Sequence, residues 1–372
     1  PVLSSNSVPL AMRLRLVQYC LVPTLSFGSE LWGMAAARSA AAEKVLNSAL
    51  RSLVRMGERS RLVSPVVLGL ETGICPVEAR AAAARSRAFL KYPTLRTVVA
   101  ELMRNPAVSG LMGRTWVGQT RRWLQTQGPE LPNQVQLPVG ANELRPYVLA
   151  GLVRNHVWAR IVMRRGGTST RLHHEQGLTS STGYVGAGAL FSQHAVGVHW
   201  LTRARVGAIW TGRAFSLIRW LPHEYRVQCP FCDEGYEGET LVHLLAECPR
   251  WDNARVILQP LVDEARAKLG LAADSGNVAT YLLGGRLRGD QGDEIQCEHW
   301  VKLPRDPQMG VRGFGNGDED RVPGFVLVAR FFEAVMPARL ALLGPLLNPP
   351  RADAPLGMAA LQQNGPPVGD PD

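Results

Sequence analysis

The sequence predicts a mainly α-helical protein that carries one small metal-binding module and ends in a disordered C-terminus. Three observations support this fold class. Apolar residues recur at three- and four-residue steps through several long segments, as they do on the buried face of an amphipathic helix. Three of the six cysteines lie within twenty residues of one another beside a histidine, which indicates a bound metal rather than a disulfide scaffold. Proline accumulates after residue 348, where no packed core is expected.

Residues 1–105 are predicted to form a first helical region. Between residues 43 and 56 the apolar side chains share one face of a helix, and Lys44, Arg51 and Arg55 lie on the opposite face. A basic outer face of this kind suits a solvated surface as well as a surface that contacts phosphate.

A second helix in the same region is expected over residues 77–91. Pro76 suits its first turn, because proline has no amide proton to lose there. Arg80, Arg87 and Lys91 recur along one side of this alanine-rich helix.

Residues 106–195 are predicted to be a connector that contains helices. A short helix is expected at residues 120–127, and helical spacing returns over residues 143–165 before two glycines stop it. Residues 166–188 are rich in glycine, serine and threonine, and we expect them to form a loop.

Residues 196–270 are predicted to hold a basic segment followed by the metal-binding module. A helix is expected from about residue 253 to 269, with Gly270 as its cap and Pro260 bending or splitting it. Residues 271–372 are rich in glycine, aspartate and, at the end, proline, so we expect a weakly ordered tail with one helix.

The two most hydrophobic windows, residues 10–32 and 325–347, are predicted to be core helices. Each is interrupted by three charged residues, which makes a membrane span costly. The chain begins at Pro1 and has no secretory signal nearby, so we expect a piece of a longer protein. The few, clustered cysteines indicate a reducing compartment, nuclear or cytoplasmic.

Positive charge is concentrated ahead of the metal motif. Residues 1–232 carry 28 Lys and Arg against 10 Glu and no Asp, a formal charge of +18, whereas the remaining 140 residues carry a charge of −8. Such asymmetry favours binding to a polyanion, because basic side chains release counterions from a phosphate backbone. Only 4 of the 41 basic residues are lysine, as a GC-rich gene would produce, but that bias does not explain the missing aspartates.

The strongest functional motif is the spacing Cys229-x2-Cys232-x10-His243-x4-Cys248. Three thiolates and one imidazole can close a tetrahedral shell around Zn²⁺ with no open position, which is typical of a structural site rather than a catalytic one. Glycines in the ten-residue loop suit the reversal between the two ligand pairs. The alternative is a set of core cysteines beside a surface histidine.

Other cysteines and histidines are weaker candidate ligands. His223 and the Cys297-x-His299 pair lie outside the compact loop, and we expect Cys20 and Cys75 to be buried helical residues.

The sequence predicts that this chain is not catalytic by itself. Two-metal polymerases and nucleases hold Mg²⁺ through carboxylates, and residues 1–232 contain no aspartate. A phosphate-binding loop with Gly-Lys-Ser/Thr is also missing, and no spacing singles out a Ser or Cys nucleophile.

Three segments resemble the stretch that follows the polymerase core of non-LTR retrotransposon reverse transcriptases. They are residues 21–32 (LVPTLSFGSELW), 49–53 (ALRSL) and 73–80 (GICPVEAR). The segment from Leu201 to Arg255 is similar to the C-terminal CCHC motif of the same family. There a Leu and Arg are followed by Gly, then by Cys-Pro-x-Cys, then by His-x4-Cys-Pro-x5-Arg, and the ten-residue loop here is somewhat long for the family.

This resemblance implies a helical thumb-like domain and a zinc-binding, helical nucleic-acid-binding tail. The parent would be an RNA-directed DNA polymerase whose palm, with its Mg²⁺, is absent from this chain. Its partners would be RNA or DNA and the upstream polymerase domain, with no membrane. We take Arg203 and Arg205, and then Arg51 and Arg55, as the candidate nucleic-acid contacts. The alternative is a zinc-stabilised helical module that binds protein, or an inactive remnant of such an element.

Overall fold

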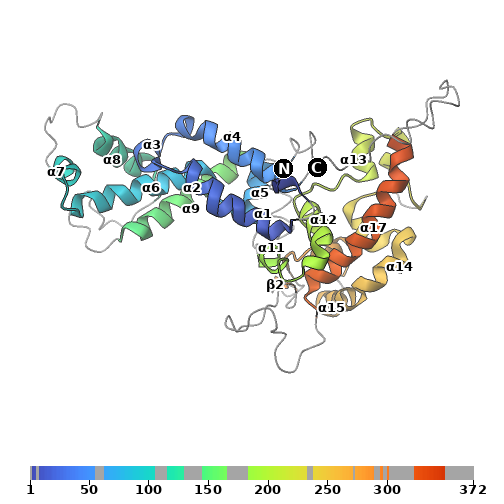
Figure 1. The fold of residues 1–372 in the computed structure, drawn as a ribbon. Helices are drawn as coiled ribbons and strands as arrows, with labels where there is room; N and C mark the ends of the chain where they lie inside the picture. The colour runs from blue at the N-terminus through green and yellow to red at the C-terminus, as the bar shows by residue number, and fades with distance from the viewer. Residues whose placement is uncertain are drawn as a thin grey trace, which may run out of the picture. The chain divides into compact units, whose positions relative to one another are not determined.

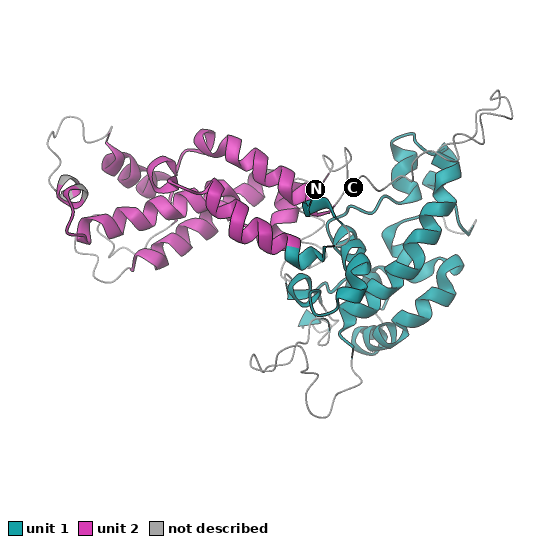
Figure 2. Ribbon diagram, viewed as in Figure 1, with its two compact units in different colours: residues 1–12, 173–372 teal, residues 13–172 magenta. Residues whose placement is uncertain are grey.

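A computed structural model describes most of the chain and is mainly helical, as predicted. The described residues are 2–5, 8–54, 63–104, 115–129, 145–165, 183–232, 238–270, 273–288, 294–295, 300 and 322–347. Their helices form two compact units (Figures 1 and 2): unit 1 comprises residues 1–12 and 173–372, and unit 2 comprises residues 13–172. In the part of the chain that is described, no helix combines the length and the apolar character needed to cross a bilayer.

Unit 2 is built from helices alone among its described residues. Helix α1 begins in unit 1 and continues into unit 2. The elements are α1 (Leu10–Leu16), η2 (Val17–Leu21), α2 (Val22–Leu25), α3 (Ser29–Trp32), α4 (Ala36–Leu53), α5 (Pro65–Thr72), α6 (Val77–Lys91), η4 (Tyr92–Thr94), α7 (Val98–Arg104), α8 (Trp116–Gln127) and α9 (Pro146–Arg165).

The core of unit 2 lies between α6 and α9. Alanines on α6 face an apolar stripe on α9 whose members recur every four residues, one helical turn apart. Small alanine side chains let the two helices approach closely, and each fully buried aliphatic side chain opposite contributes about 1.5–3 kcal/mol. The stripe consists of Leu149, Val153, Val157 and Ile161, all buried.

Arg85 on α6 ties three parts of unit 2 together. It is 4% exposed, and its guanidinium donates hydrogen bonds to Thr120 Oγ1 (2.8 Å), to the carbonyl of Gly33 (2.8 Å) and to the carbonyl of Trp116 (3.1 Å). The first and last partners belong to α8, and Gly33 lies in the turn between α3 and α4. Gly33 also packs against α6 so closely that an added Cβ would meet the Ala81 carbonyl oxygen at 2.2 Å.

Unit 1 is also helical, with one short antiparallel strand pair, β1 with β2, among its described residues. Its elements are η1 (Val2–Ser4), α11 (Gly183–Ala187), η6 (Ser192–His194), α12 (Ala195–Arg205), α13 (Gly212–Leu217), η7 (His223–Arg226), η8 (His243–Glu247), η9 (Pro249–Trp251), α14 (Asp252–Arg255), η10 (Val256–Leu258), α15 (Gln259–Leu269), α16 (Ser275–Leu282), β1 (Leu287–Arg288), β2 (Glu294–Ile295) and α17 (Gly324–Leu347).

The central contact of unit 1 joins α12 to α17, which lie side by side (Figure 1). Gly197 makes this possible, because a Cβ there would meet the Ala329 carbonyl oxygen at 2.2 Å. Glu333 on α17 accepts a hydrogen bond from the Gly197 amide (3.1 Å) and lies 2.9 Å from His194 Nδ1. The Glu333 carboxylate therefore accepts from a free amide in the first turn of α12, where the helix dipole favours negative charge.

Several predicted boundaries agree with the structure. Helix α6 spans the predicted residues 77–91, with Pro76 at its N-cap. The helix expected at 253–269 is split into α14, η10 and α15, with Pro260 in the first turn of α15 and Gly270 at its C-cap with a φ of +55°.

Three expectations need correction. The structure divides the chain into two units rather than four segments, and the boundary falls inside the predicted connector, 106–195. The expected loop at 166–188 ends in a helix, α11, whose Tyr184 and Val185 are buried. The tail, 271–372, was expected to hold one helix but holds two among its described residues, and the second, α17, is central to unit 1. The predicted helix stop at Gly166 and the end of the chain after residue 347 lie outside the described residues.

Candidate metal centre

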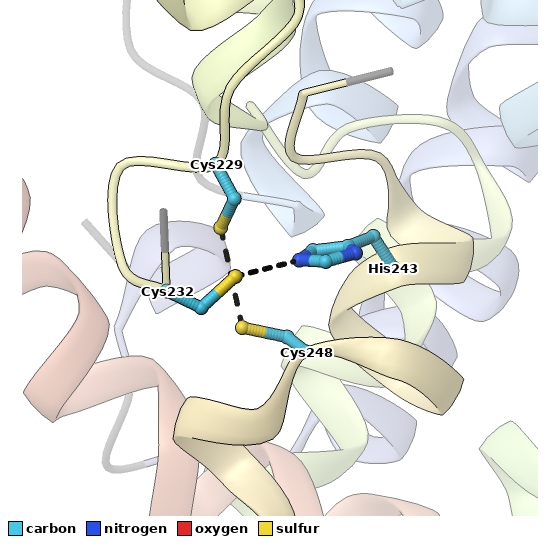
Figure 3. A group of neighbouring side chains, drawn as sticks. All are labelled: Cys229, Cys232, His243 and Cys248. Carbon is cyan, nitrogen blue, oxygen red and sulfur yellow. Dashed lines mark hydrogen bonds between the residues drawn. The ribbon is translucent and has the colours of Figure 1, made fainter. Parts of the chain in front are cut away.

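The four predicted ligands come together in unit 1 from two short structures (Figure 3). Cys229 and Cys232 lie in a turn that follows η7. His243 begins η8, a single wide helical turn that ends at Glu247, and Cys248 follows it directly. His243 and Cys248 thus come from the two ends of one wide turn, and their ligand atoms lie close enough to share a metal ion.

The ligand atoms of this cluster all lie within 4.8 Å of one another. Cys229 Sγ is 4.0 Å from Cys248 Sγ, and Cys232 Sγ is 3.3 Å from His243 Nε2. Cys229 and Cys248 are fully buried, His243 is 5% exposed and Cys232 is partly exposed. The sequence motif therefore corresponds to a three-dimensional cluster with the donors and the compactness that a metal ion requires.

A carboxylate holds the histidine in place. His243 Nδ1 lies 3.4 Å from Glu247 Oε2, one helical turn further on. A ligating histidine normally donates its other ring N–H to a carboxylate or carbonyl, which fixes the tautomer and aims the free nitrogen at the metal. Glu247 is in the position to do this, and Nε2 faces the sulfurs.

Without a metal, the buried Cys229 thiol holds its proton firmly. The contact with Cys248 and burial raise the pKa of Cys229 to about 12. The hydrogen bond with Cys229 raises the pKa of His243, against the opposing effect of burial. Because a metal binds thiolates and neutral imidazole, an ion entering this cluster must displace those protons.

Gly238 shapes the loop between the two ligand pairs. Its φ is +68°, in the left-handed region, and an added Cβ would lie 2.8 Å from the carbonyl oxygens of Tyr225 and Arg226. The expectation that glycine serves the reversal of this loop is thus met at Gly238, whereas Gly235 lies outside the described residues.

A buried ion pair links the loop to α17, and the sequence analysis missed it. Glu239 and Arg339 are 0% and 1% exposed, and the guanidinium contacts the carboxylate through Nε–Oε1 (2.6 Å) and Nη2–Oε2 (2.7 Å). Arg339 also donates to the Trp210 carbonyl, and its Cζ lies 5.6 Å from the centre of the Phe231 ring. Because the partners are 100 residues apart, no local spacing signals the pair.

The candidate nucleic-acid contacts differ in burial, and the prediction for Arg205 needs correction. It is 2% exposed, donates to the Leu283 carbonyl and lies over the rings of Tyr184 and Trp300, so a phosphate cannot reach it in this fold. Arg203, two residues earlier, is only partly buried and lies 4.6 Å from the Trp200 ring. Residues two apart point to different sides of a helix, which explains the difference.

The other candidate residues lie elsewhere in the chain. Arg51 is partly buried on α4, and Arg55 lies outside the described residues. Among the weaker ligand candidates, His223 is not part of the cluster, Cys75 is buried as expected, and Cys20 is exposed rather than buried. The Cys297-x-His299 pair is outside the described residues.

The four side chains can hold a metal ion, but they leave it no open coordination position. Four protein ligands complete a tetrahedral shell, so no position is left for water or a substrate. Comparison of the chain with protein-family models, with curated proteins and with solved structures finds no match.

Proposed function

We propose that this chain is the zinc-containing, nucleic-acid-binding C-terminal region of a non-LTR retrotransposon reverse transcriptase and that it lacks the catalytic palm. The observation that carries the proposal is the Cys229–Cys232–His243–Cys248 cluster, whose ligand order and flanking residues resemble the CCHC motif of that family. The proposal places the chain inside the cell, in a nuclear or cytoplasmic reducing compartment, because free thiols persist there.

The ligand types favour zinc as the metal, and the spacing of the ligand atoms is compatible with it. Bonds of about 2.3 Å to sulfur and about 2.0 Å to nitrogen place tetrahedral ligand atoms about 3.5–3.8 Å apart. The separations of 4.0 Å between the Cys229 and Cys248 sulfurs and 3.3 Å between Cys232 Sγ and His243 Nε2 are close to these values. Soft thiolates with one imidazole also favour Zn²⁺ over Mg²⁺ or Ca²⁺.

The distribution of charge between the units supports nucleic acid as the partner. The residues of unit 2 include 23 Lys and Arg against 8 Glu and no Asp, a formal charge of +15, whereas unit 1 has 18 against 23, a charge of −5. A unit of this charge attracts a polyanion by releasing its counterions. Unit 2 therefore supplies the main phosphate-binding surface in this proposal, with unit 1 as the zinc-stabilised partner unit.

The proposal is tested by measuring binding of labelled structured RNA and nicked duplex DNA to the purified chain between 50 and 200 mM salt. We expect binding at low salt that weakens steeply, with a slope of about 0.9 per phosphate contact on duplex DNA. We also expect one zinc ion per chain and no polymerase activity. Absence of binding at the lowest salt would contradict the proposal, and polymerisation by this chain alone would contradict the assignment of a missing palm.

A protein-binding module is the second candidate, and an exposed apolar patch favours it. Leu217, Ile218 and Trp220 at the end of α13 are 57%, 40% and 44% exposed, and the residue between the last two, Arg219, has a φ of +63°. Apolar side chains that cluster on a surface often mark a contact with another protein. Reversing the charges of Arg51 and Arg203 separates the candidates, because only the first predicts weaker nucleic-acid binding.

A further inference from the structure

Three arginines from three helices of unit 2 line one pocket. They are Arg38 on α4, Arg85 on α6 and Arg122 on α8, and Met34, Ala35 and Trp123 are also part of the lining. We call these six residues the arginine pocket. None of the described residues that line the pocket is acidic, so three positive charges converge on one cavity without a carboxylate among them.

The start of α4 adds further positive potential to the arginine pocket. Helix α4 has 18 residues, its N-cap residue, Ala35, makes no side-chain capping bond, and its first turn contains no acidic residue. Ala35 itself lines the pocket. The first turn instead carries Arg38, a cation at the positive end of the helix dipole, where an anion is the stabilising partner. A helix start usually carries negative charge, and this one carries positive charge instead. A bound anion would supply the missing negative charge.

The three arginines divide into one fixed and two accessible groups. Arg85 is held by its hydrogen bonds to Thr120, Gly33 and Trp116, and burial together with the charge of Arg38 lowers its pKa. Arg38 and Arg122 are exposed, and neither pairs with an acidic side chain within the described part of the chain. A bound anion would therefore meet two guanidinium groups that can close on it, with the buried charge of Arg85 behind them.

The backbone at the edge of the arginine pocket is held in an unusual conformation. Met34 has a φ of +67°, which costs energy for any residue with a Cβ. Its neighbour Gly33 is pressed against the Ala81 carbonyl and accepts a hydrogen bond from Arg85. The same arginine that lines the pocket thus fixes the turn that leads into α4.

We propose that the arginine pocket binds a backbone phosphate of a nucleic acid. Guanidinium groups bind phosphate oxygens through pairs of hydrogen bonds, and a helix start offers free amides to the same group. Trp123, partly buried beside the arginines, offers an aromatic surface to the adjoining sugar or base. The inference rests on the proposed function, because the charge of +15 on unit 2 is what favours a polyanion over a small phosphate ester.

The test compares two double variants of the full chain that lose the same charge. The pocket variant is Arg38→Gln with Arg122→Gln, and the control is Arg87→Gln with Arg154→Gln, which are exposed arginines on α6 and α9 outside the pocket lining. We leave Arg85 unchanged because its hydrogen bonds are structural. Thermal unfolding of both variants checks that each is folded before affinity for a labelled single-stranded RNA is measured.

We expect the pocket variant to bind the RNA at least about tenfold more weakly than the control. The salt dependence of its affinity should also fall by the equivalent of about two phosphate contacts. Equal weakening of both variants, while the unaltered chain binds, overturns the pocket and leaves the proposed function standing. No binding by the unaltered chain overturns both. Inorganic phosphate is the second probe: if it stabilises the unaltered chain against unfolding, but neither variant affects RNA binding, the pocket holds free phosphate and the nucleic-acid assignment is wrong.

Discussion

Glu239 and Arg339 form an ion pair that is inaccessible to solvent on both sides. Removing one partner of such a pair leaves the other charge buried, which typically costs about 3–5 kcal/mol. We therefore expect Glu239→Gln to lower the free energy of unfolding of unit 1 by this amount in urea denaturation of the full chain. Glu78→Gln is the control, because its partner Arg164 is 52% exposed and such a pair contributes at most about 1 kcal/mol. Equal effects of the two substitutions would show that the buried pair has no special role.

Glu247 is the residue that we expect to tune metal affinity without binding the metal. Substituting the carboxylate that orients a ligating histidine typically weakens metal binding by about 10–100-fold. Glu247→Gln should therefore weaken zinc binding by that factor, measured by competition with a chromogenic chelator. Glu224→Gln, an exposed acid on η7, is the matched control and should leave the affinity unchanged. An unchanged affinity for the Glu247 variant would mean that the contact at 3.4 Å does not orient His243.

At the residue scale, the sequence predicted the metal cluster better than the basic contacts. Four ligands of fixed chemistry at short spacing have few structural alternatives, and Cys229, Cys232, His243 and Cys248 do come together. An arginine has no such constraint: whether it faces solvent depends on helix phase and packing, and Arg205 is buried for that reason. The same limit hid the arginine pocket, because its residues come from helices far apart in the sequence.

At the element scale, two glycines separate the effect of helix packing on stability from the effect of helix propensity. Gly197 on α12 touches the backbone of α17, where an added Cβ would lie 2.2 Å from a carbonyl oxygen, whereas nothing lies within 4 Å of a Cβ built on Gly151 in α9. We expect Gly197→Ala to destabilise unit 1 by about 1–3 kcal/mol, because the helices must separate. Gly151→Ala should instead stabilise by about 0.5–1 kcal/mol. Thermal unfolding measures both, and stabilisation by Gly197→Ala would contradict the close helix contact.

Periodicity predicted the long helices, and local stop signals predicted some of their ends. Helix α6 agrees over its full length, and Gly270 caps α15 with a φ of +55°. Helices α11 and α16 were missed because they are short and rich in glycine, serine and alanine, so that tertiary packing rather than propensity stabilises them. The role of α17 was missed because its contacts with α12 and Glu239 are remote in sequence.

At the scale of the whole molecule, the excess of positive charge and the metal-ligand cluster lie in different units. The sequence located the positive charge upstream of the metal motif, and the division into units assigns +15 to unit 2 and −5 to unit 1. What composition could not supply was the boundary itself, because it falls in a stretch that has no clear helical pattern. It also could not show that residues 324–347 close the core of the unit that carries the metal cluster.

This arrangement predicts that metal removal unfolds one unit and spares the other. Structural zinc contributes about 10–16 kcal/mol of apparent binding free energy in small peptides near neutral pH, which exceeds the stability of most single domains. The cluster lies in the loop that Glu239 joins to α17, so loss of the ion should loosen α17 and with it the contact to α12. Unit 2 has its own core between α6 and α9 and no part in the cluster.

Hydrogen exchange of the full chain before and after chelation measures this directly. We expect amides of α12 and α17 to lose protection by several orders of magnitude, and amides of α6 and α9 to change little. Cys248→Ser should reproduce the pattern without a chelator, whereas Cys75→Ser, a buried thiol of unit 2 outside the cluster, should not. Uniform loss of protection in both units would contradict independent cores. Full protection of α17 after the ion is removed would show that unit 1 stays folded without the metal.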